Sequence, residues 1–539
     1  MTTRYAKKLP VFVVALATLG VFAPLCRHEF LTWDDPFNIA ANPNFNPPTW
    51  RGIANHWQAT SAGLYVPLTY SVWGGLAFLS SAGHGAGPNP WLFHGASVAL
   101  HVLCATVVFA TIKRLFGTPW AAAAGALFFA VHPLQVEAVA WASGLKDVLA
   151  GVLSLLAVWQ YVRFAQGSDN ASRVIYCGAT AALLLAMLAK PNAVVAIGVA
   201  LVLDLVFLRR NFRQVAGAIV PWIILCAPLV AVARIVQSGQ PLVNVPIFQR
   251  PLVALDALGF YLWKLILPIN LAPVYGRTPA SVISQGWTTW TWMLPVALAL
   301  LLTIARCRRH LAPPLAAGAL IFIVSLLPVL GFTPFIFQFF SSVADHYLYI
   351  AMLGPAIVFA YLCTLRRTLR VACAAVLVVL AVMSVRQQRH WTDSIALFEH
   401  TLRVAPDAPG IHNNYGAALA DVGRLDEALA RFQIALTTDP DNRLVHTNLA
   451  QLYALFNDPD RAIAHVEIAL RQVDARPREL GWDPVLNHYL LGVALMTRQR
   501  FDDAAVHFEK VLMTHPQYKD ARGLLGYCRT RASTRPAAK

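Results

Sequence analysis

Eleven apolar stretches constrain this chain more than any other feature of its sequence. Each approaches the length needed to cross a hydrocarbon core of about 30 Å. They lie at 9–26, 91–112, 119–134, 145–164, 173–189, 191–208, 215–236, 288–305, 312–330, 346–365 and 371–385. The 539 residues are 57% hydrophobic and 13% charged, which excludes a soluble globular protein. We therefore predict an all-α, polytopic membrane domain of about 11 transmembrane helices over residues 1–385.

The net charge of +16 belongs to this membrane part. Residues 1–385 carry 24 Lys+Arg and 9 Asp+Glu, whereas residues 386–539 carry 19 and 18. The basic residues gather in short loops on one side, as the positive-inside rule expects of cytoplasmic loops, so we predict a cytoplasmic N-terminus and no nucleic-acid partner. Residues 253–268 are rich in aromatic residues, and we expect an interfacial helix there, although a further span stays open.

A 34-residue helical repeat pattern begins near Ala408. Its small, large and turn-forming positions match the tetratricopeptide repeat, and three copies suffice for a stable stack. We predict a second domain over 386–539, with a half repeat at 391–406, repeats at 409–442, 443–476 and 485–518, and a capping helix at 519–530. Eleven spans would place this domain outside the cytoplasm, on the same side as a large first loop at 27–90.

Most acidic residues of the membrane part map to that outer side. They are Glu29, Asp34, Asp35, Glu137, Asp147, Asp256 and Asp345. Since carboxylates are costly near apolar spans, we expect the chemistry to be external. Asp34 and Asp35 follow the first span beside Trp33, where a carboxylate could act as a general base. A helix cap or a salt bridge in the loop is the structural alternative.

A second polar group surrounds a short external crossing between two spans. It contains His132, Glu137, Lys146 and Asp147. These side chains could bind a substrate, or they could pair with one another, for example Glu137 with Lys146.

Basic residues of the outer side form a third group. Lys190 precedes Pro191, which breaks an otherwise continuous apolar run. With Lys146, Arg250 and Lys264 it could neutralise a phosphate group. Snorkelling of each side chain to the lipid headgroups is the competing explanation.

Taken in order, these motifs resemble the transmembrane and tetratricopeptide-repeat O-mannosyltransferases of the GT-C superfamily, in a bacterial member. The resemblance rests on the repeats and on Trp33-Asp34-Asp35, His132-Pro133 with Glu137-Ala138-Val139, Lys146-Asp147, Lys190-Pro191 and Asp345-His346-Tyr347-Leu348-Tyr349. It implies that Asp34 or Asp35 is the catalytic base. It implies a donor site formed by His132, Glu137, Lys146, Asp147, Lys190, Arg250, Lys264 and His346. His346 stands where the family pattern has Arg, so a phosphate contact there would depend on pH or be missing.

The expected reaction is inverting transfer of a sugar, mannose by resemblance, from a polyprenyl-phosphate donor to a Ser/Thr hydroxyl of a protein held by the repeats. The acceptor would contact His412, Asn413, Asn414, His446, Asn448 and His488. No Cys or His spacing suggests a metal site, and we expect no cofactor. The alternatives are a non-enzymatic scaffold for envelope proteins and a GT-C enzyme that modifies a lipid-linked glycan or polysaccharide. We expect a bacterial inner membrane, with the repeats in the periplasm.

Overall fold

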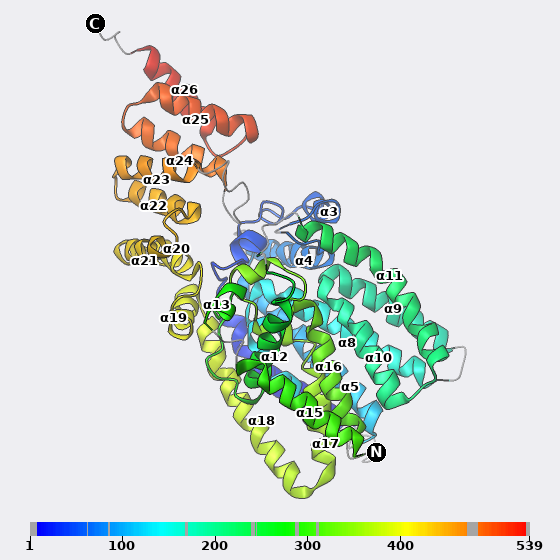
Figure 1. Ribbon diagram of the computed structural model, residues 1–539. Coiled ribbons are helices and arrows are strands. Elements are labelled where there is room, and N and C mark those ends of the chain that lie inside the picture. Colours follow the sequence, from blue (N-terminus) through cyan, green and yellow to red (C-terminus); the bar gives the residue numbers. More distant parts are fainter. Residues whose placement is uncertain are drawn as a thin grey trace. The chain divides into compact units, whose positions relative to one another are not determined.

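The computed structural model describes residues 8–61, 63–84, 87–167, 171–238, 243, 245–285, 290–308, 312–471 and 483–534 (Figure 1). These residues form helices joined by turns, and the extended backbone among them is limited to two isolated bridges, Phe45 with Pro48 and Ser61 with Leu64. The chain divides into two compact units, Met1–Ala408 and Pro409–Lys539. The all-α architecture predicted from the sequence is confirmed.

Each of the eleven predicted apolar stretches contains a helix. These are α2 (Leu9–Phe22), α5 (Pro90–Phe116), α6 (Pro119–Val131), α8 (Leu145–Ala165), α9 (Ala171–Ala189), α10 (Val195–Val202), α11 (Phe212–Ser238), α15 (Met293–Cys307), α16 (Pro313–Leu326), α17 (Leu353–Leu365) and α18 (Arg367–Gln388). Among the described residues, seven helical segments are long and apolar enough to cross a membrane, and the bent pair Pro119–Val131 and Pro133–Ala140 raises the number to eight if it is one span.

The three remaining predicted spans are shorter apolar helices, Met293–Cys307, Pro313–Val329 and Leu353–Leu365. Helices of this length reach roughly 20–25 Å, less than the hydrocarbon core of a typical bilayer. Length and composition therefore support seven or eight of the eleven spans among the described residues. The segment expected at the interface forms α12 (Arg250–Ile266), which is not one of them. The chain is an integral membrane protein.

Two proline breaks shape the part of the membrane unit that carries the polar residues. Pro133 ends α6, and the chain continues through the short helices η3 (Pro133–Gln135), α7 (Val136–Ala140) and η4 (Ala142–Gly144) before α8 begins. Pro191 separates α9 from η5 (Pro191–Val194) and α10. Because proline lacks an N–H and clashes with the preceding turn, both helices end there and polar side chains gather at the breaks.

The predicted first external loop is largely helical. It contains η2 (Pro36–Ala40), α3 (Trp50–Gln58) and α4 (Pro67–His84). The pattern of apolar spans could not reveal these helices, since α3 is short and carries exposed tryptophans, with Trp50 75% exposed.

The described part of the second unit contains three helical hairpins and a final helix. The hairpins are α20 (Ile411–Asp421) with α21 (Leu425–Thr438), α22 (Arg443–Leu455) with α23 (Pro459–Arg471), and α24 (Pro484–Thr497) with α25 (Phe501–Thr514), followed by α26 (Ala521–Ser533). Gly416 and Gly492 lie against the rings of Phe432 and Phe508, where an added Cβ would come within 2.7 and 2.8 Å of a ring carbon. The helices of a hairpin can cross closely only because these positions are small.

The three hairpins occupy residues 411–438, 443–471 and 484–514, and the predicted repeats were 409–442, 443–476 and 485–518. Most of the insertion predicted between repeats two and three, 476–484, lies outside the described residues. The half repeat predicted at 391–406 forms α19 (Ser394–Val404), which belongs to the first unit. The structure therefore divides the chain after Ala408, later than the predicted boundary after residue 385.

Candidate active site

Asp35 connects the segment after α2 to the segment between α6 and α8. Its side chain is fully buried, one oxygen accepts the Leu31 N–H at 2.9 Å, and the other accepts the Ser143 N–H at 2.8 Å. Burial raises the pKa of Asp35 to about 6, and these hydrogen bonds limit the rise. Both oxygens of Asp35 are thus committed to the backbone.

Asp34 has the opposite arrangement. Its side chain is partly exposed, and no hydrogen bond or ion pair within the described chain engages its carboxylate. Burial raises the pKa of Asp34, while the positive charge of Lys146 lowers it. Of the two adjacent acids, Asp34 is the one with oxygens available to a substrate.

A hydrogen-bonded chain of side chains holds the same two loops together. The side-chain Nδ2 of Asn38 donates to the Ser143 hydroxyl at 3.1 Å, and the Tyr70 hydroxyl donates to the Asn38 Oδ1 at 2.9 Å. Ser143 lies three residues before Lys146. The loop that carries Asp34 is therefore fixed relative to the start of α8.

The buried charges around α8 pair differently from the pairing considered from the sequence. Lys190 forms an ion pair with Asp147. Glu137 accepts the His346 backbone N–H at 3.0 Å and contacts the His346 Nδ1 at 2.7 Å. The suggested pair between Glu137 and Lys146 is wrong, because the proline break turns Glu137 toward the 345–348 segment.

Lys146 is left as a buried cation beside Asp34. Its side chain is 9% exposed, and its Nζ lies 4.6 Å from the centre of the Trp141 ring. Within the described residues it takes part in no ion pair. A buried ammonium group without a carboxylate partner is a favourable place for an anionic substrate group.

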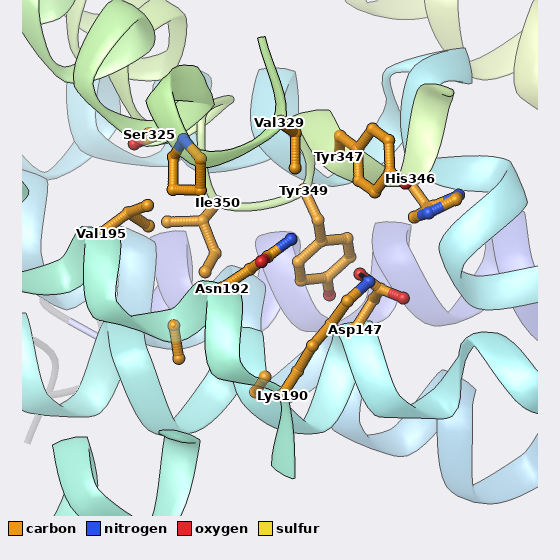
Figure 2. A pocket seen from close by; sticks show the side chains of 13 residues that line it. Asp147, Lys190, Asn192, Val195, Ser325, Val329, His346, Tyr347, Tyr349 and Ile350 are labelled. Carbon is orange, nitrogen blue, oxygen red and sulfur yellow. Dashed lines mark hydrogen bonds and ion pairs between the residues drawn. The ribbon is translucent and has the colours of Figure 1, made fainter. Parts of the chain in front are cut away.

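A small cavity with about 30 Å³ of free space lies beside the ion pair of Asp147 and Lys190 (Figure 2). Its polar lining comes from α8, from the break at Pro191, from the end of α16 and from the segment after Asp345. The polar lining residues are Asp147, Lys190, Asn192, Ser325, His346, Tyr347 and Tyr349. Two buried oxygens in this wall, Asp147 Oδ2 and Ser325 Oγ, have no hydrogen-bond partner in the described part of the chain.

Five of the predicted donor-site residues do not line this cavity. Glu137 and Lys146 are described above, and the other three are His132, Arg250 and Lys264. His132 contacts the Leu265 carbonyl oxygen through Nε2 at 3.2 Å. Arg250 donates from Nε to the Val245 carbonyl oxygen at 3.0 Å, and Lys264 donates to the carbonyl oxygens of residues 269 and 270. All three bind backbone carbonyls, so we leave them out of the proposed donor site.

Several residues that complete the site were not among the predicted ones. Asn192 follows Lys190-Pro191, and Tyr347 follows His346, so both were next to predicted positions. Ser325, Asn38 and Ser143 carried no signal of their own, because an isolated serine or asparagine is ordinary in a span or loop. No group of three or more His, Cys, Asp or Glu among the described residues is arranged to hold a metal ion.

The predicted acceptor residues of the repeats fall into two groups. Asn448 donates to Asn413 at 2.8 Å, and Asn413 donates to Asn414 at 3.2 Å, which connects α22 to α20. His446 contacts His465 with 2.9 Å between their Nδ1 atoms, and His488 contacts His507 at 3.0 Å. The asparagines gather across two repeats, whereas His446 and His488 are engaged within their own hairpins.

His412 completes the predicted set, at the position of α20 that corresponds to His446 and His488.

Comparison with known proteins finds similarity over most of the chain. Tetratricopeptide-repeat models match residues 379–443 and 419–478. Human protein O-mannosyl-transferase TMTC1 is 27% identical over 486 residues, which cover 78% of this chain and 54% of the human protein. The chain is similar to proteins described as protein O-mannosyl-transferases.

Further relatives carry the same description. A Caenorhabditis elegans protein O-mannosyl-transferase is 23% identical over 65% of this chain and 51% of its own length. Drosophila melanogaster Tmtc2 is 30% identical over 36% of this chain and 20% of its own length. The chain spans about half the length of the first of these relatives.

Among solved structures, ArnT from Cupriavidus metallidurans, bound to undecaprenyl phosphate, aligns over 98% of this chain and 88% of its own. The TM-score is 0.37 at 15% identity, too low to bear on the fold.

Proposed function

We propose that this chain transfers a sugar, mannose by homology, from a polyprenyl-phosphate donor to a Ser/Thr hydroxyl of a protein acceptor. The observation that carries the proposal is the pair of unlike charges at the first loop. Asp34 has a free carboxylate, and Lys146 is a buried cation next to it. A proton acceptor and an anion site thus lie side by side, as a displacement at a sugar phosphate requires.

In this reaction the acceptor hydroxyl gives its proton to Asp34 while its oxygen attacks the anomeric carbon. The bond from that carbon to the phosphate oxygen breaks, and the electron pair leaves with the polyprenyl phosphate. Lys146 neutralises the charge that develops on the phosphate. A single displacement inverts the anomeric configuration.

The repeats supply the acceptor side of the proposal. The amides of Asn413, Asn414 and Asn448 connect two neighbouring repeat helices, and an amide can donate to a peptide carbonyl and accept from a peptide N–H. We propose that an extended acceptor segment binds along these asparagines. We also propose a bacterial inner membrane, with the repeats and Asp34 both on the periplasmic side.

Reconstitution tests the activity. Purified full-length protein in liposomes is supplied with polyprenyl-phosphate mannose and Ser/Thr-containing peptides, and the wild type is compared with Asp34→Asn and Asp35→Asn. We expect Asp34→Asn to reduce transfer about 10²- to 10⁴-fold. The scaffold alternative predicts no transfer by any variant, and equal transfer by all three would remove Asp34 as the base.

The orientation is tested separately by labelling a single cysteine. Met513 in α25 is 82% exposed, so Met513→Cys in a cysteine-free chain reports the side of the repeats. We expect a membrane-impermeant maleimide to label it from the periplasm of intact cells. Labelling only after the inner membrane is opened would overturn the periplasmic placement.

A further inference from the structure

The start of α19 is attached at two points to the segment that leads to Asp34. The Glu29 N–H donates to the Thr392 carbonyl oxygen at 3.0 Å, and the Thr32 N–H donates to the Ser394 hydroxyl at 2.9 Å. Thr32 and Ser394 are 362 residues apart in the chain. The proposed reaction gives these contacts no part, although Thr32 lies only two residues before the proposed base.

The residue between Thr32 and Asp34 also packs against α19. The centre of the Trp33 ring lies 6.1 Å from that of Phe398, which is fully buried and lies four residues after Ser394 on the helix. Aromatic rings at this separation attract each other in addition to the apolar area that they bury. A hydrogen bond at residue 32 and a ring contact at residue 33 therefore attach both residues before Asp34 to the same helix.

The helix α19 is itself held in place within the first unit. Asp393 caps its start and accepts the Ala396 N–H at 2.8 Å. Farther along the helix, the buried His400 contacts the Leu271 carbonyl oxygen through Nε2 at 2.9 Å. Gln387, near the end of α18, donates to the same carbonyl oxygen at 2.9 Å. A helix that is capped and attached at a second point can support a neighbouring segment.

The carboxylate of Asp34 needs such support from its neighbours. No hydrogen bond or ion pair within the described chain engages it, so the backbone beside it sets its position. A general base must lie within hydrogen-bond reach of the proton that it takes, and a displacement of about 1 Å can slow a reaction by a factor on the order of 10². Contacts that hold residues 32 and 33 therefore bear on the rate of the chemical step.

We infer that Ser394 is a positioning residue, whose hydroxyl acts through the Thr32 N–H to hold Asp34 where it can take the proton of the acceptor. Phe398 supports the same segment through Trp33. This inference rests on the proposed function. The tetratricopeptide-repeat model matches residues 379–443, which include α19, yet α19 belongs to the first unit. A helix with the repeat pattern thus supports the proposed base rather than binding the acceptor.

The first test separates kcat from KM in full-length protein reconstituted in liposomes. Wild type, Ser394→Ala and Ser394→Thr are supplied with polyprenyl-phosphate mannose and a Ser/Thr-containing peptide. We expect Ser394→Ala to lower kcat about 3- to 10-fold, as the loss of one hydrogen bond allows. Its KM for the donor should stay within about 2-fold, since the phosphate is proposed to bind at Lys146. Ser394→Thr keeps a hydroxyl at this position and should recover most of kcat.

Thr401→Val is the matched control. Thr401 is fully buried on α19, and its hydroxyl donates to the Leu397 carbonyl oxygen of the same helix at 2.7 Å. The substitution removes a hydroxyl from α19 and leaves the contact with Thr32 in place, so we expect kcat to stay at the wild-type value. An equal fall of kcat in Thr401→Val and Ser394→Ala would overturn the inference, and so would a Ser394→Thr variant as slow as Ser394→Ala.

Hydrogen exchange of the same proteins reports the position of the segment without any substrate. We expect peptides that cover residues 28–35 to exchange about 3- to 10-fold faster in Ser394→Ala than in wild type or Thr401→Val, because the Thr32 N–H has lost its acceptor. Unchanged exchange would overturn the inference.

The two measurements together separate this inference from the proposed function. If the wild type transfers mannose and Ser394→Ala exchanges faster but keeps the wild-type kcat, the proposed function stands and the positioning role is refuted. If the wild type transfers no sugar, the proposed function fails and this inference fails with it. Faster exchange with a lower kcat in Ser394→Ala alone supports both.

Discussion

Asp34 and Asp35 differ in their hydrogen bonds, and this difference predicts different effects of their substitution. In wild type, the two oxygens of Asp35 accept from the backbone N–H groups of Leu31 and Ser143. In Asp35→Asn, the single side-chain oxygen can accept from only one of them, and the new amide NH₂ faces the other N–H. Losing a hydrogen bond to a charged group costs about 1.5–3 kcal/mol, and a buried unpaired N–H costs about 1–3 kcal/mol more. Burial raises the pKa of Asp35 to about 6, which means that the buried charge is unfavourable. Its removal therefore offsets roughly 3 kcal/mol of this loss.

The net expectation for Asp35→Asn is a destabilisation on the order of 1–2 kcal/mol, or a Tm lower by roughly 2–6 °C. Asp34→Asn should behave differently, because no hydrogen bond in the described chain engages its carboxylate and burial raises its pKa. Neutralising Asp34 should leave the Tm unchanged or raise it, while transfer falls about 10²- to 10⁴-fold. Asp35 is thus expected to stabilise the fold, whereas the carboxylate of Asp34 is expected to lower stability and to serve the proposed reaction.

The assay measures both quantities on the same preparations. Intrinsic fluorescence follows thermal unfolding in detergent, and liposome reconstitution follows mannosyl transfer. The reasoning fails if Asp34→Asn lowers the Tm as much as Asp35→Asn does. It also fails if Asp35→Asn abolishes transfer without loss of stability, because the base would then be Asp35.

Four further outcomes are expected. Burial raises the pKa of Asp34, so the acid limb of the pH–rate profile should lie above the usual aspartate pKa of about 3.9. Lys146→Met removes a positive charge and should move this limb to higher pH. An unchanged limb would exclude Asp34 as its source. Glu137→Ala leaves the His346 backbone and ring without their acceptor, at a cost of about 3 kcal/mol in thermal unfolding, whereas Glu427→Ala, an exposed control, should cost little. Burial and the partner histidines lower the pKa of His465 and His507 to about 4, below the unfolded value of about 6.5. Stability is therefore lost as pH falls from about 6.5 toward 4, and hydrogen exchange in α23 and α25 should quicken at pH 5 in wild type but change less in the His465→Gln/His507→Gln variant. Transfer should survive EDTA treatment, and its loss and recovery with a divalent cation would show a metal requirement.

The sequence predicted the helices better than it predicted the partners of the polar residues. Apolar stretches and proline positions depend on local composition, so α8, α9 and the break at Lys190-Pro191 were visible in the chain. The repeats were equally visible, since Gly416 and Phe432 recur as Gly492 and Phe508. The number of spans was harder, because α15 and α17 are apolar but short.

Pairing within the site depends on residues far apart in the chain. Glu137 contacts His346, 209 residues later, and Asp35 contacts Ser143, 108 residues later. A sequence pattern cannot tell which of Asp34 and Asp35 turns inward, since both follow the same span. Only the backbone N–H groups of Leu31 and Ser143 decide it, and backbone atoms carry no sequence signal.

The cavity wall also determines when the site can exist during synthesis. Asp34 and Lys146 leave the ribosome early, but the wall is closed by Ser325 and by His346 and Tyr347, after most of the membrane unit has been made. A nascent chain that ends before α16 therefore contains Asp34 and Lys146 without the residues that close the cavity. The site around Asp147 and Lys190 is therefore complete only after the segment that follows α16 has been made.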